Sequence, residues 1–258
     1  MKPKISVIIP IFNGGKFLPR CLDSLLNQTF QDWVAICIDD GSTDNTASVL
    51  DEYSARDKRF TVVHKKNAGV SAARNDGIKL AKTEYVHFMD ADDVLDENYY
   101  AEIMNQAKQI NADIYVSGFV SNSKYSANLV YKKRHVLFTL FGKLFWTQAL
   151  IKSFVWRYVF RTDFIKKNKL FFDTNLISQE DAIFVLQSFV LSDKVVIVPN
   201  VNYHYIFNTD SALNKKGKAH REKLKKQYKI AKQYKIKYAK DNNVMFLWQW
   251  RKIIKLFF

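Results

Sequence analysis

Residues 85–93 read Tyr-Val-His-Phe-Met-Asp-Ala-Asp-Asp, an apolar run that ends abruptly in three carboxylates within four residues. Carboxylates this close repel one another unless a cation lies between them. Hard divalent cations bind oxygen ligands, often one or two carboxylates together with substrate phosphates. Residues 90–93 are therefore either a metal-bridged phosphate site at the end of a buried strand or a solvated acidic turn before a helix that begins near Asn98. The stretch alone leaves both interpretations open.

Apolar periodicity on either side of this stretch predicts an alternation of strands and helices. Strands are expected over residues 5–10, 33–38, 60–64, 85–89 and 113–117, with helices over about 17–26, 44–55, 72–81 and 98–109 between them. Further along, a helix should begin at the pair Glu180-Asp181, and a strand over 195–198 should end at Pro199. This order predicts an α/β fold with a mostly parallel central sheet and helices on both faces.

Polar residues directly follow several of these predicted strands. Ligands bind such sheets beyond the carboxyl ends of the strands, so residues at those ends should meet along one edge. The group expected there is Pro10, Phe12, Asn13, Asp39, Asp40, Asn67, Asp90 and Asp92. This grouping favours a ligand site over an acidic turn.

Motifs that are missing from the sequence narrow the class of ligand site. There is no G-x-G-x-x-G, P-loop or G-x-S-x-G, which argues against a dinucleotide oxidoreductase, a P-loop kinase or an α/β-hydrolase. A phosphate ligand would then be held by metal and side chains. Arg74, early in the third helix, is either a phosphate ligand at the same edge or a surface arginine.

Cys21 and Cys37 lack metal or disulfide spacing, are expected in the core and fit a reducing cytosol.

Four segments carry a family resemblance: residues 7–13 (VIIPIFN), 38–44 (IDDGSTD), 67–75 (NAGVSAARN) and 88–93 (FMDADD). In this order they resemble the successive motifs of family-2 glycosyltransferases of the GT-A fold. The match covers about residues 5–100, and the rest of the chain resembles the family more loosely through Trp156, the Glu180-Asp181 pair and residues 203–205 (YHY). The resemblance implies transfer of a sugar from a nucleotide-sugar, usually a UDP-sugar, to an acceptor hydroxyl with inversion at the anomeric carbon.

The resemblance also implies roles for individual residues. Pro10, Phe12 and Asp40 would hold the base with Asp39 close by, Arg74 and Asp90 would contact the phosphate or ribose, and Asp92 would bind Mn²⁺ or Mg²⁺. The whole implied nucleotide-binding set is Pro10, Phe12, Asn13, Asp39, Asp40, Arg74, Asp90 and Ala91, and the metal set is Asp92, Asp90 and His204. His204 could complete the metal shell through its imidazole or could simply be packed between its tyrosine neighbours.

Asp181, next to Glu180, would be the general base. A carboxylate that takes the proton of an acceptor hydroxyl is worth roughly 10²–10⁴-fold in rate. In-line displacement needs it opposite the leaving group, so it should come from the second half of the chain. Alternatively, the pair is only favourable charge at a helix N-terminus. Relatives often carry an arginine after the tyrosine cluster, whereas residues 206–211 here read IFNTDS, which leaves phosphate contacts from this loop open.

Charge divides the chain unevenly. The net charge is +15, yet residues 1–212 carry 25 Lys and Arg against 23 Asp and Glu, while residues 213–258 carry 15 against 2. Apolar residues recur at helical spacing within this basic tail, which is typical of helices that lie on anionic membranes. The alternative is a helix pair packed on the domain. No apolar run approaches the roughly 20 residues of a bilayer span, and residues 5–12 form too short a run for a signal peptide.

Together these features predict a nucleotide-sugar-binding half over residues 1–112, an acceptor-binding half over 113–212 and a basic amphipathic helical tail over 213–258. We expect a metal-dependent enzyme on the cytoplasmic face of the membrane that uses a UDP-sugar and a glycan or glycolipid acceptor, such as lipooligosaccharide or capsule. Nucleic acid is not expected as a partner, and a homo-oligomer is left open. The alternatives are a sugar nucleotidyltransferase and a non-catalytic membrane- or nucleic-acid-binding protein. Eight aromatic residues between 136 and 160 are expected mostly in the core.

Overall fold

The computed structural model describes residues 3–123, 128–149, 152–176, 178–208 and 218–244. Strands are β1 (Ile5–Ile11), β2 (Trp33–Asp39), β3 (Phe60–His64), β4 (Tyr85–Phe88), β5 (Val94–Leu95), β6 (Ile114–Ser121), β7 (His135–Leu137), β8 (Tyr158–Arg161) and β9 (Val195–Tyr205). Helices are α1 (Leu18–Leu26), α2 (Thr46–Arg56), α3 (Val70–Leu80), α4 (Tyr99–Gln109), α5 (Leu140–Trp146), α6 (Thr162–Lys167), α7 (Glu180–Leu191) and α8 (Lys218–Asp241), with a 3-10 turn at Val155–Arg157.

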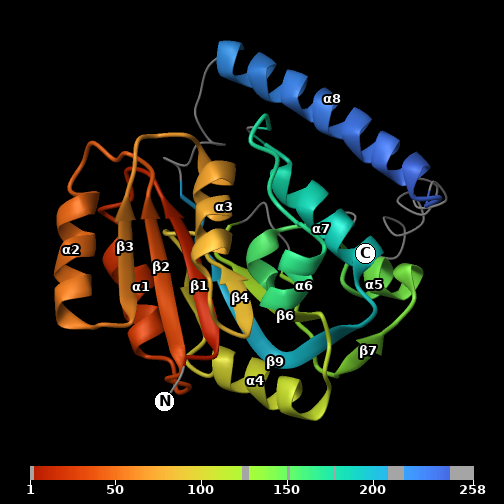
Figure 1. Cartoon of the computed structure of the whole chain (residues 1–258), viewed down its shortest axis with the longest axis horizontal. Coiled ribbons are helices and arrows are strands. Elements are labelled where there is room, and N and C mark those ends of the chain that lie inside the picture. Colours follow the sequence, from red (N-terminus) through yellow and green to blue (C-terminus); the bar gives the residue numbers. More distant parts are fainter. Residues whose placement is uncertain (1–2, 124–127, 150–151, 177, 209–217, 245–258) are drawn as a thin grey trace.

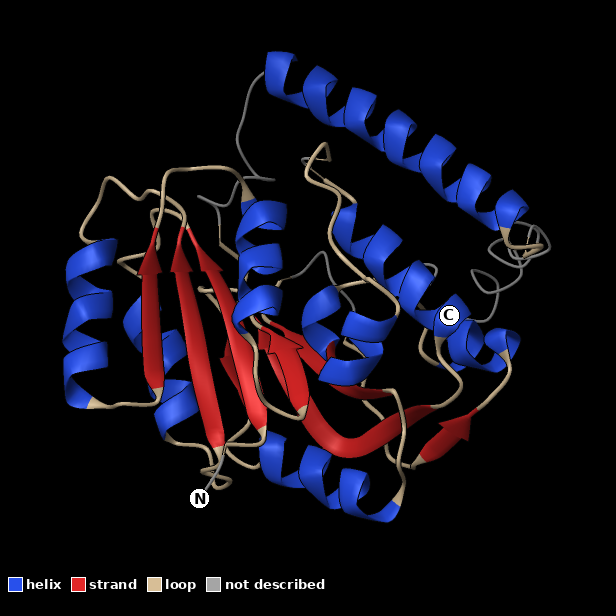
Figure 2. Cartoon of the chain, in the orientation of Figure 1, coloured by secondary structure: helices blue, strands red, loops and turns tan. Residues whose placement is uncertain are grey.

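All nine described strands belong to one sheet in the order β3-β2-β1-β4-β8-β6-β9-β5, and β7 pairs with β9 (Figures 1 and 2). Strands β1 to β4 are parallel, so their carboxyl ends lie along one edge of the sheet. Strand β8 runs antiparallel between β4 and β6. The predicted α/β fold with a mostly parallel sheet is confirmed.

Alternation along β1 explains why helices cover both faces. Ile5, Val7 and Ile9 pack into a cluster with α1 and α4 on one face, whereas Ile8 packs with α3 and α7 on the other. Strand residues buried on both sides read as a continuous apolar run, as this strand does. Helix α3 lies so close to β1 that a Cβ at Gly77 would come within 2.3 Å of the Ile8 side chain. A glycine is therefore needed at this crossing.

Strand β9 continues through Pro199 to Tyr205, so the prediction that this strand ends at Pro199 is wrong. The pairing of β9 with β6 shifts register between Val116 and Gly118, and Pro199 lies in the resulting bulge, where the missing N–H does not break the ladder. Asn200 takes the left-handed conformation with φ of 57° and donates its N–H to Tyr131 O. The bulge is what carries residues 203–205 back towards the acidic residues after β4.

The expectation that the aromatics between residues 136 and 160 lie mostly in the core is also wrong. Trp156, Tyr158 and Phe160 are buried, but Phe138, Phe141, Trp146 and Phe154 are exposed. Phe141 and Trp146 lie on α5, Phe138 directly follows β7, and Phe154 precedes the 3-10 turn. In the described part of the chain, no helix combines the length and apolar character that a membrane span requires. The division of the chain at residue 112 stays a prediction.

Candidate active site

Parallel register brings the predicted rim residues to one edge of the sheet. Ile11 on β1 pairs with Asp39 on β2, and Asp39 pairs with His64 on β3. The Asp40 N–H donates to Ile11 O at 2.8 Å, and the Met89 N–H donates to Ile8 O at 3.0 Å. The arrowheads of β1 to β3 point to the same end of the molecule in Figure 1, and the loops that follow them form the rim of the site.

The two aspartates at the carboxyl end of β2 bind neighbouring segments of the chain. Asp40 accepts hydrogen bonds from the N–H groups of Ala68 and Gly69 at 2.9 and 2.7 Å, so its carboxylate fixes the start of α3. Asp39 accepts from the Ser42 N–H and from His64 Nδ1 at 2.8 Å. Burial alone would raise the pKa of Asp39, but these hydrogen bonds outweigh it and hold that pKa below its usual value. His64 was not among the predicted residues.

The loop after β1 is bonded to the loop after β2. The Asn13 N–H donates to Ser42 Oγ at 2.9 Å, and Asn13 Oδ1 accepts from the Thr43 N–H at 2.8 Å. Phe12 stands at the rim with 52% of its surface exposed, and Pro10 behind it is half-buried. An exposed aromatic ring beside a polar rim is suited to stacking on a planar ligand.

Arg74 joins the two halves of the chain. Its guanidinium donates through Nη2 to Asp90 Oδ1 at 3.0 Å, and through Nη1 to Asp181 Oδ1 at 2.7 Å and Glu180 Oε1 at 3.1 Å. The arginine side chain is only 4% exposed and lies over the Phe172 ring at 5.2 Å. We call Arg74, Asp90, Glu180 and Asp181 the Arg74 cluster. A buried arginine is stable only when paired, and three carboxylates pair this one.

The position of Arg74 goes beyond what its sequence context indicated. It was expected to meet phosphate at the rim, and it does lie beside Asp90 of the rim. Its contacts with Glu180 and Asp181, more than a hundred residues later in the chain, were not predicted. Nothing in the spacing of these residues signals the pairing, because it depends on how α7 packs against α3.

Asp181 has the electrostatic environment of a proton acceptor. Burial raises the pKa of Asp181 to about 7, with Glu180 and Asp90 adding to the rise and Arg74 opposing it. Its second oxygen, Oδ2, accepts the Val155 N–H at 3.2 Å, so both oxygens are held. Glu180 and Asp181 do lie in the first turn of α7, as charge at a helix N-terminus would require. A pKa near neutrality is, in addition, what suits a general base to ordinary conditions.

The three carboxylates of residues 90–93 differ in burial: Asp90 and Asp92 are half-buried, and Asp93 is internal. Asp93 is buried and is fully engaged: Tyr203 Oη donates to Oδ2 and the Ile206 N–H donates to Oδ1, each at 2.8 Å. Asp92 Oδ2 accepts from Asn208 Nδ2 at 3.1 Å, and Arg20 donates to the Asp92 carbonyl. Burial, together with the charge of Asp90, raises the pKa of Asp92. Ala91 lies beside Gly14 and packs against the core.

A divalent cation fits Asp90 and Asp92 better than it fits the full predicted set. Both are hard oxygen ligands, and Asp90 lies close enough to raise the pKa values of Asp92 and Asp93, a repulsion that a cation would relieve. His204 is not brought together with them, since its Nε2 is bonded to Asp96 Oδ1. Within the described residues, no group of three or more His, Cys, Asp or Glu side chains is arranged to hold a metal. A cation here would therefore share two carboxylates with ligand oxygens.

An aromatic stack borders the acidic residues on the side of β9. Trp156 stacks on Tyr203 with ring centroids 4.2 Å apart and on Phe154 at 5.0 Å, and Tyr205 lies parallel to it at 6.0 Å. Burial, together with the charges of Asp93, Asp92 and Asp90, raises the pKa of Tyr205. Alternation along β9 turns Tyr203 and Tyr205 to the acidic side and His204 away from it.

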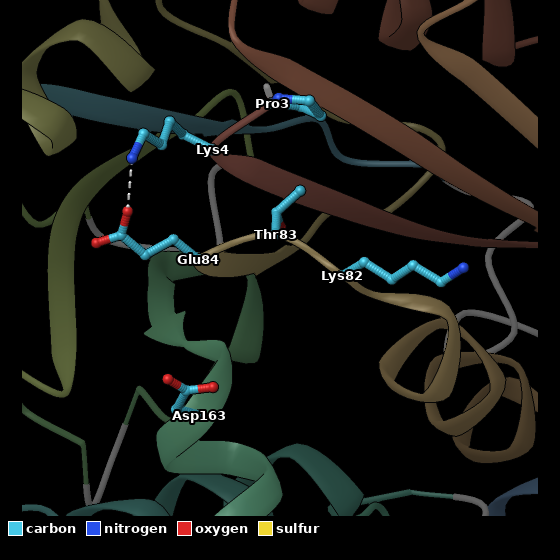
Figure 3. A pocket seen from close by; sticks show the side chains of 6 residues that line it. All are labelled: Pro3, Lys4, Lys82, Thr83, Glu84 and Asp163. Atoms are coloured by element: carbon cyan, nitrogen blue, oxygen red, sulfur yellow. Dashed lines mark hydrogen bonds and ion pairs between the residues drawn. The ribbon is translucent and has the colours of Figure 1, made fainter. Parts of the chain in front are cut away.

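A hollow of about 280 Å³ lies at the opposite edge of the sheet. It is lined by residues that precede β1 and β4 and by Asp163 on α6, and Figure 3 shows the ion pair between Lys4 and Glu84 at its side. Ser6 and Thr83 share a hydrogen bond of 2.8 Å beneath it. Because it lies at the amino ends of the parallel strands, it is separate from the carboxylate-rich edge.

Comparison with known proteins agrees with the site and the fold. The model of glycosyl transferase family 2 matches residues 6–184, about two thirds of the chain, and the chain belongs to this family. It is therefore a glycosyltransferase by class. This membership favours glycosyl transfer over the nucleotidyltransferase and the non-catalytic alternatives.

Three relatives illustrate the likeness. The chain is 32% identical over 238 residues to the uncharacterized glycosyltransferase EpsJ of Bacillus subtilis, which covers 88% of this chain and 68% of EpsJ. It is 31% identical to the poly(ribitol-phosphate) beta-N-acetylglucosaminyltransferase TarP of Staphylococcus aureus, covering 82% of this chain and 65% of TarP. The crystal structure of S. aureus TarS 1-349 in complex with UDP-GlcNAc superposes with a TM-score of 0.72 at 22% identity, over 84% of this chain and 60% of that one. The last comparison confirms the GT-A fold. The chain thus spans about two thirds or less of the length of these relatives.

Proposed function

We propose that the protein transfers a sugar from a UDP-sugar to a hydroxyl of a cell-surface glycan or glycolipid, with inversion at the anomeric carbon. The observation that carries this proposal is the Arg74 cluster, in which one guanidinium holds the carboxylate proposed as base, Asp181, and a carboxylate of the proposed donor site, Asp90. The common cation fixes the proposed base relative to the proposed leaving-group site, and in-line displacement depends on that relative placement.

The donor site is assigned to the rim. Phe12 presents an exposed ring for the uracil base, with Pro10, Asn13, Asp39 and Asp40 shaping the loop behind it. The TarS crystal structure holds UDP-GlcNAc, and we extend a UDP-sugar donor from that protein to this one. Ala91 and Gly14 keep the space between the first loop and the acidic turn small.

Mn²⁺ or Mg²⁺ is proposed as the cofactor, with Asp92 and Asp90 as its protein ligands. When bound, such a cation would neutralise charge on the departing diphosphate. Asn208 orients Asp92 through its hydrogen bond. The Asp90 N–H donates to Tyr203 Oη at 3.0 Å, and Tyr203 Oη in turn donates to Asp93, so these two residues hold the backbone of the acidic turn.

Asp181 is proposed to take the proton of the acceptor hydroxyl. The hydroxyl oxygen then forms the new glycosidic bond as the bond between the anomeric carbon and the UDP oxygen breaks, and the departing UDP keeps that electron pair. Attack from the side of α7 on a donor held at the β4 edge inverts the anomeric configuration. The aromatic stack borders this side: Trp156 is buried in it, and the exposed Phe154 and half-buried Tyr205 offer apolar faces to an acceptor sugar.

The acceptor class and the compartment complete the proposal. The name of TarP specifies a poly(ribitol-phosphate) acceptor, and by extension we propose a cell-surface polymer or glycolipid for this chain, with a hexosyl or N-acetylhexosaminyl group transferred. Cys21 and Cys37 are free and buried, which fits the reducing cytoplasm where we place the enzyme.

A screen of nucleotide-sugars tests the reaction. The purified full chain should be protected against thermal unfolding by UDP and by one or more UDP-sugars, and should hydrolyse the cognate UDP-sugar slowly in the absence of acceptor. Hydrolysis should stop with EDTA and return with Mn²⁺ or Mg²⁺. Protection by other nucleotides but not by UDP would refute the donor, and full activity in EDTA would refute the metal requirement.

A further inference from the structure

Helix α8 presents a lysine-rich face away from the domain. Its inner side is packed: Ala231 is buried against Leu176 and Ile183, and Ala239 is buried in the core cluster that includes α7. Lys235 Nζ donates to Gln179 Oε1 at 3.1 Å, and Gln187 donates to Tyr234 Oη at 3.4 Å. The apolar stripe that the sequence assigned to a membrane interface therefore serves in part to hold α8 on α7.

The outer side of α8 is different in character. Among the residues whose side chains are described, its exposed cations are Lys223, Lys225, Lys226, Lys229, Lys232, Lys237 and Lys240, opposed by Glu222 and Asp241. At 100° per residue, most of these lysines fall on the arc opposite Ala231 and Ala239, and a helix of 24 residues is about 36 Å long. Ile230, 40% exposed, falls within this arc, whereas Tyr228, 44% exposed, falls on the same side of the helix as Ala231 and Ala239.

We propose that this outer face of α8 binds the anionic headgroups of a lipid bilayer by electrostatic contact, without insertion of the helix. The described cations are all lysines, which act as point charges rather than as bidentate phosphate clamps, so a diffuse anionic surface suits them better than a specific polymer strand. Because these lysines lie along one side of a helix, several of them can contact a flat membrane surface at the same time. The half-exposed Ile230 side chain within this arc suits the level of the headgroups.

The position of α8 gives this contact a consequence for the site. Its inner side contacts Gln179, the residue directly before Glu180 and Asp181. Figure 1 shows α8 at the end of the molecule to which β1 to β3 point, the end where the rim lies. A bilayer on the outer face of α8 would thus lie beside the site, where an acceptor anchored in the same leaflet could reach it.

Vesicle binding by the full chain tests the proposal independently of any transfer reaction. The protein should sediment with vesicles of phosphatidylcholine that contain phosphatidylglycerol, should not sediment with phosphatidylcholine alone, and should be released by added salt. The triple variant Lys226→Gln, Lys229→Gln, Lys237→Gln should bind the anionic vesicles on the order of a hundredfold more weakly, since each lysine near an anionic leaflet contributes about 1 kcal/mol and 1.4 kcal/mol is tenfold.

A matched control replaces three exposed lysines on other parts of the surface, Lys58→Gln, Lys82→Gln and Lys108→Gln, and should bind as the unmodified protein does. Equal losses in both triple variants would overturn the assignment to α8, as would unchanged binding of the α8 variant. Binding to neutral vesicles, or binding to soluble polyphosphate with none to anionic vesicles, would overturn the choice of a bilayer. Circular dichroism of each variant confirms that it is folded.

Discussion

Transfer should depend on pH through Asp181: kcat/KM should rise about tenfold per pH unit up to about pH 7 and level off above it. The rate rises with pH because only the ionised carboxylate of Asp181 can accept the proton of the acceptor hydroxyl. A pKa of about 7, against an ordinary value of 3.8, corresponds to at most about 4 kcal/mol that disfavours the ionised form. The side chain is 21% exposed, so solvent moderates this penalty.

The substitution Glu180→Gln should move this inflection to lower pH. The two carboxylates share Arg74 Nη1, with oxygens 2.7 and 3.1 Å from it, so these oxygens are at most about 6 Å apart. At an effective dielectric constant of 20, two unit charges at that separation repel by about 2–3 kcal/mol. Removing one of them should lower the apparent pKa of Asp181 by about one to two.

The measurement is UDP release at a series of pH values with subsaturating donor, so that kcat/KM reports the free enzyme. Glu52→Gln is the matched control, since Glu52 is exposed on α2 and pairs only with Arg56 among the described residues. An inflection near pH 4 in the unmodified protein, or one that Glu180→Gln leaves in place, would refute the reasoning.

Three further substitutions separate the roles within the site. Asp181→Asn should abolish transfer and leave UDP binding by calorimetry intact, whereas Asp92→Asn should weaken both, and equal UDP-binding defects would contradict this division. Arg74→Lys keeps the positive charge but loses the planar guanidinium that reaches three carboxylates, so it should lower the free energy of unfolding by about 1–3 kcal/mol. An unchanged denaturant midpoint would contradict this prediction. Phe12→Ala should weaken UDP binding about tenfold or more, the value of one aromatic–base stack, without changing Tm. The control Phe138→Ala removes an exposed ring that directly follows β7 and should leave UDP binding unchanged.

Local patterns were enough to predict the first half of the fold. Strands β1, β2 and β4 are short apolar runs with Pro or Asp at or next to their carboxyl ends, and such runs are typical of buried parallel strands. Because ligands bind beyond the carboxyl ends of parallel strands, these runs also predict that Asp39, Asp40 and Asp90 lie on one rim. The hydrogen bonds of Asn13 with Ser42 and Thr43 show that the rim is a continuous structure.

The second half depends on contacts that sequence spacing does not encode. Strand β9 passes its proline because a bulge opposite Gly118 absorbs it, and a Cβ at Gly118 would lie 2.7 Å from Asn202 Oδ1. The bulge also sets which side of β9 each residue faces, so that Tyr203 meets Asp93 while His204 meets Asp96. A local pattern can indicate a tyrosine–histidine–tyrosine segment, but only the register decides which of them reaches the site.

Arg74 links folding to chemistry in this molecule. Without α7, Asp90 would be the one carboxylate of the Arg74 cluster still paired with the guanidinium. Without Arg74, the three carboxylates would be left close together in a largely buried site. Breaking a buried ion pair in this way lowers the free energy of unfolding by about 3–5 kcal/mol. The arrangement therefore forms only when the second half of the chain folds onto the first. The same contact sets how far the pKa of Asp181 rises, because Arg74 opposes the effect of burial on that carboxylate. A stronger ion pair would keep Asp181 ionised but make it a weaker base, and a weaker pair would leave it protonated at neutral pH. The balance between burial and Arg74 is thus what fits Asp181 to accept a proton near pH 7.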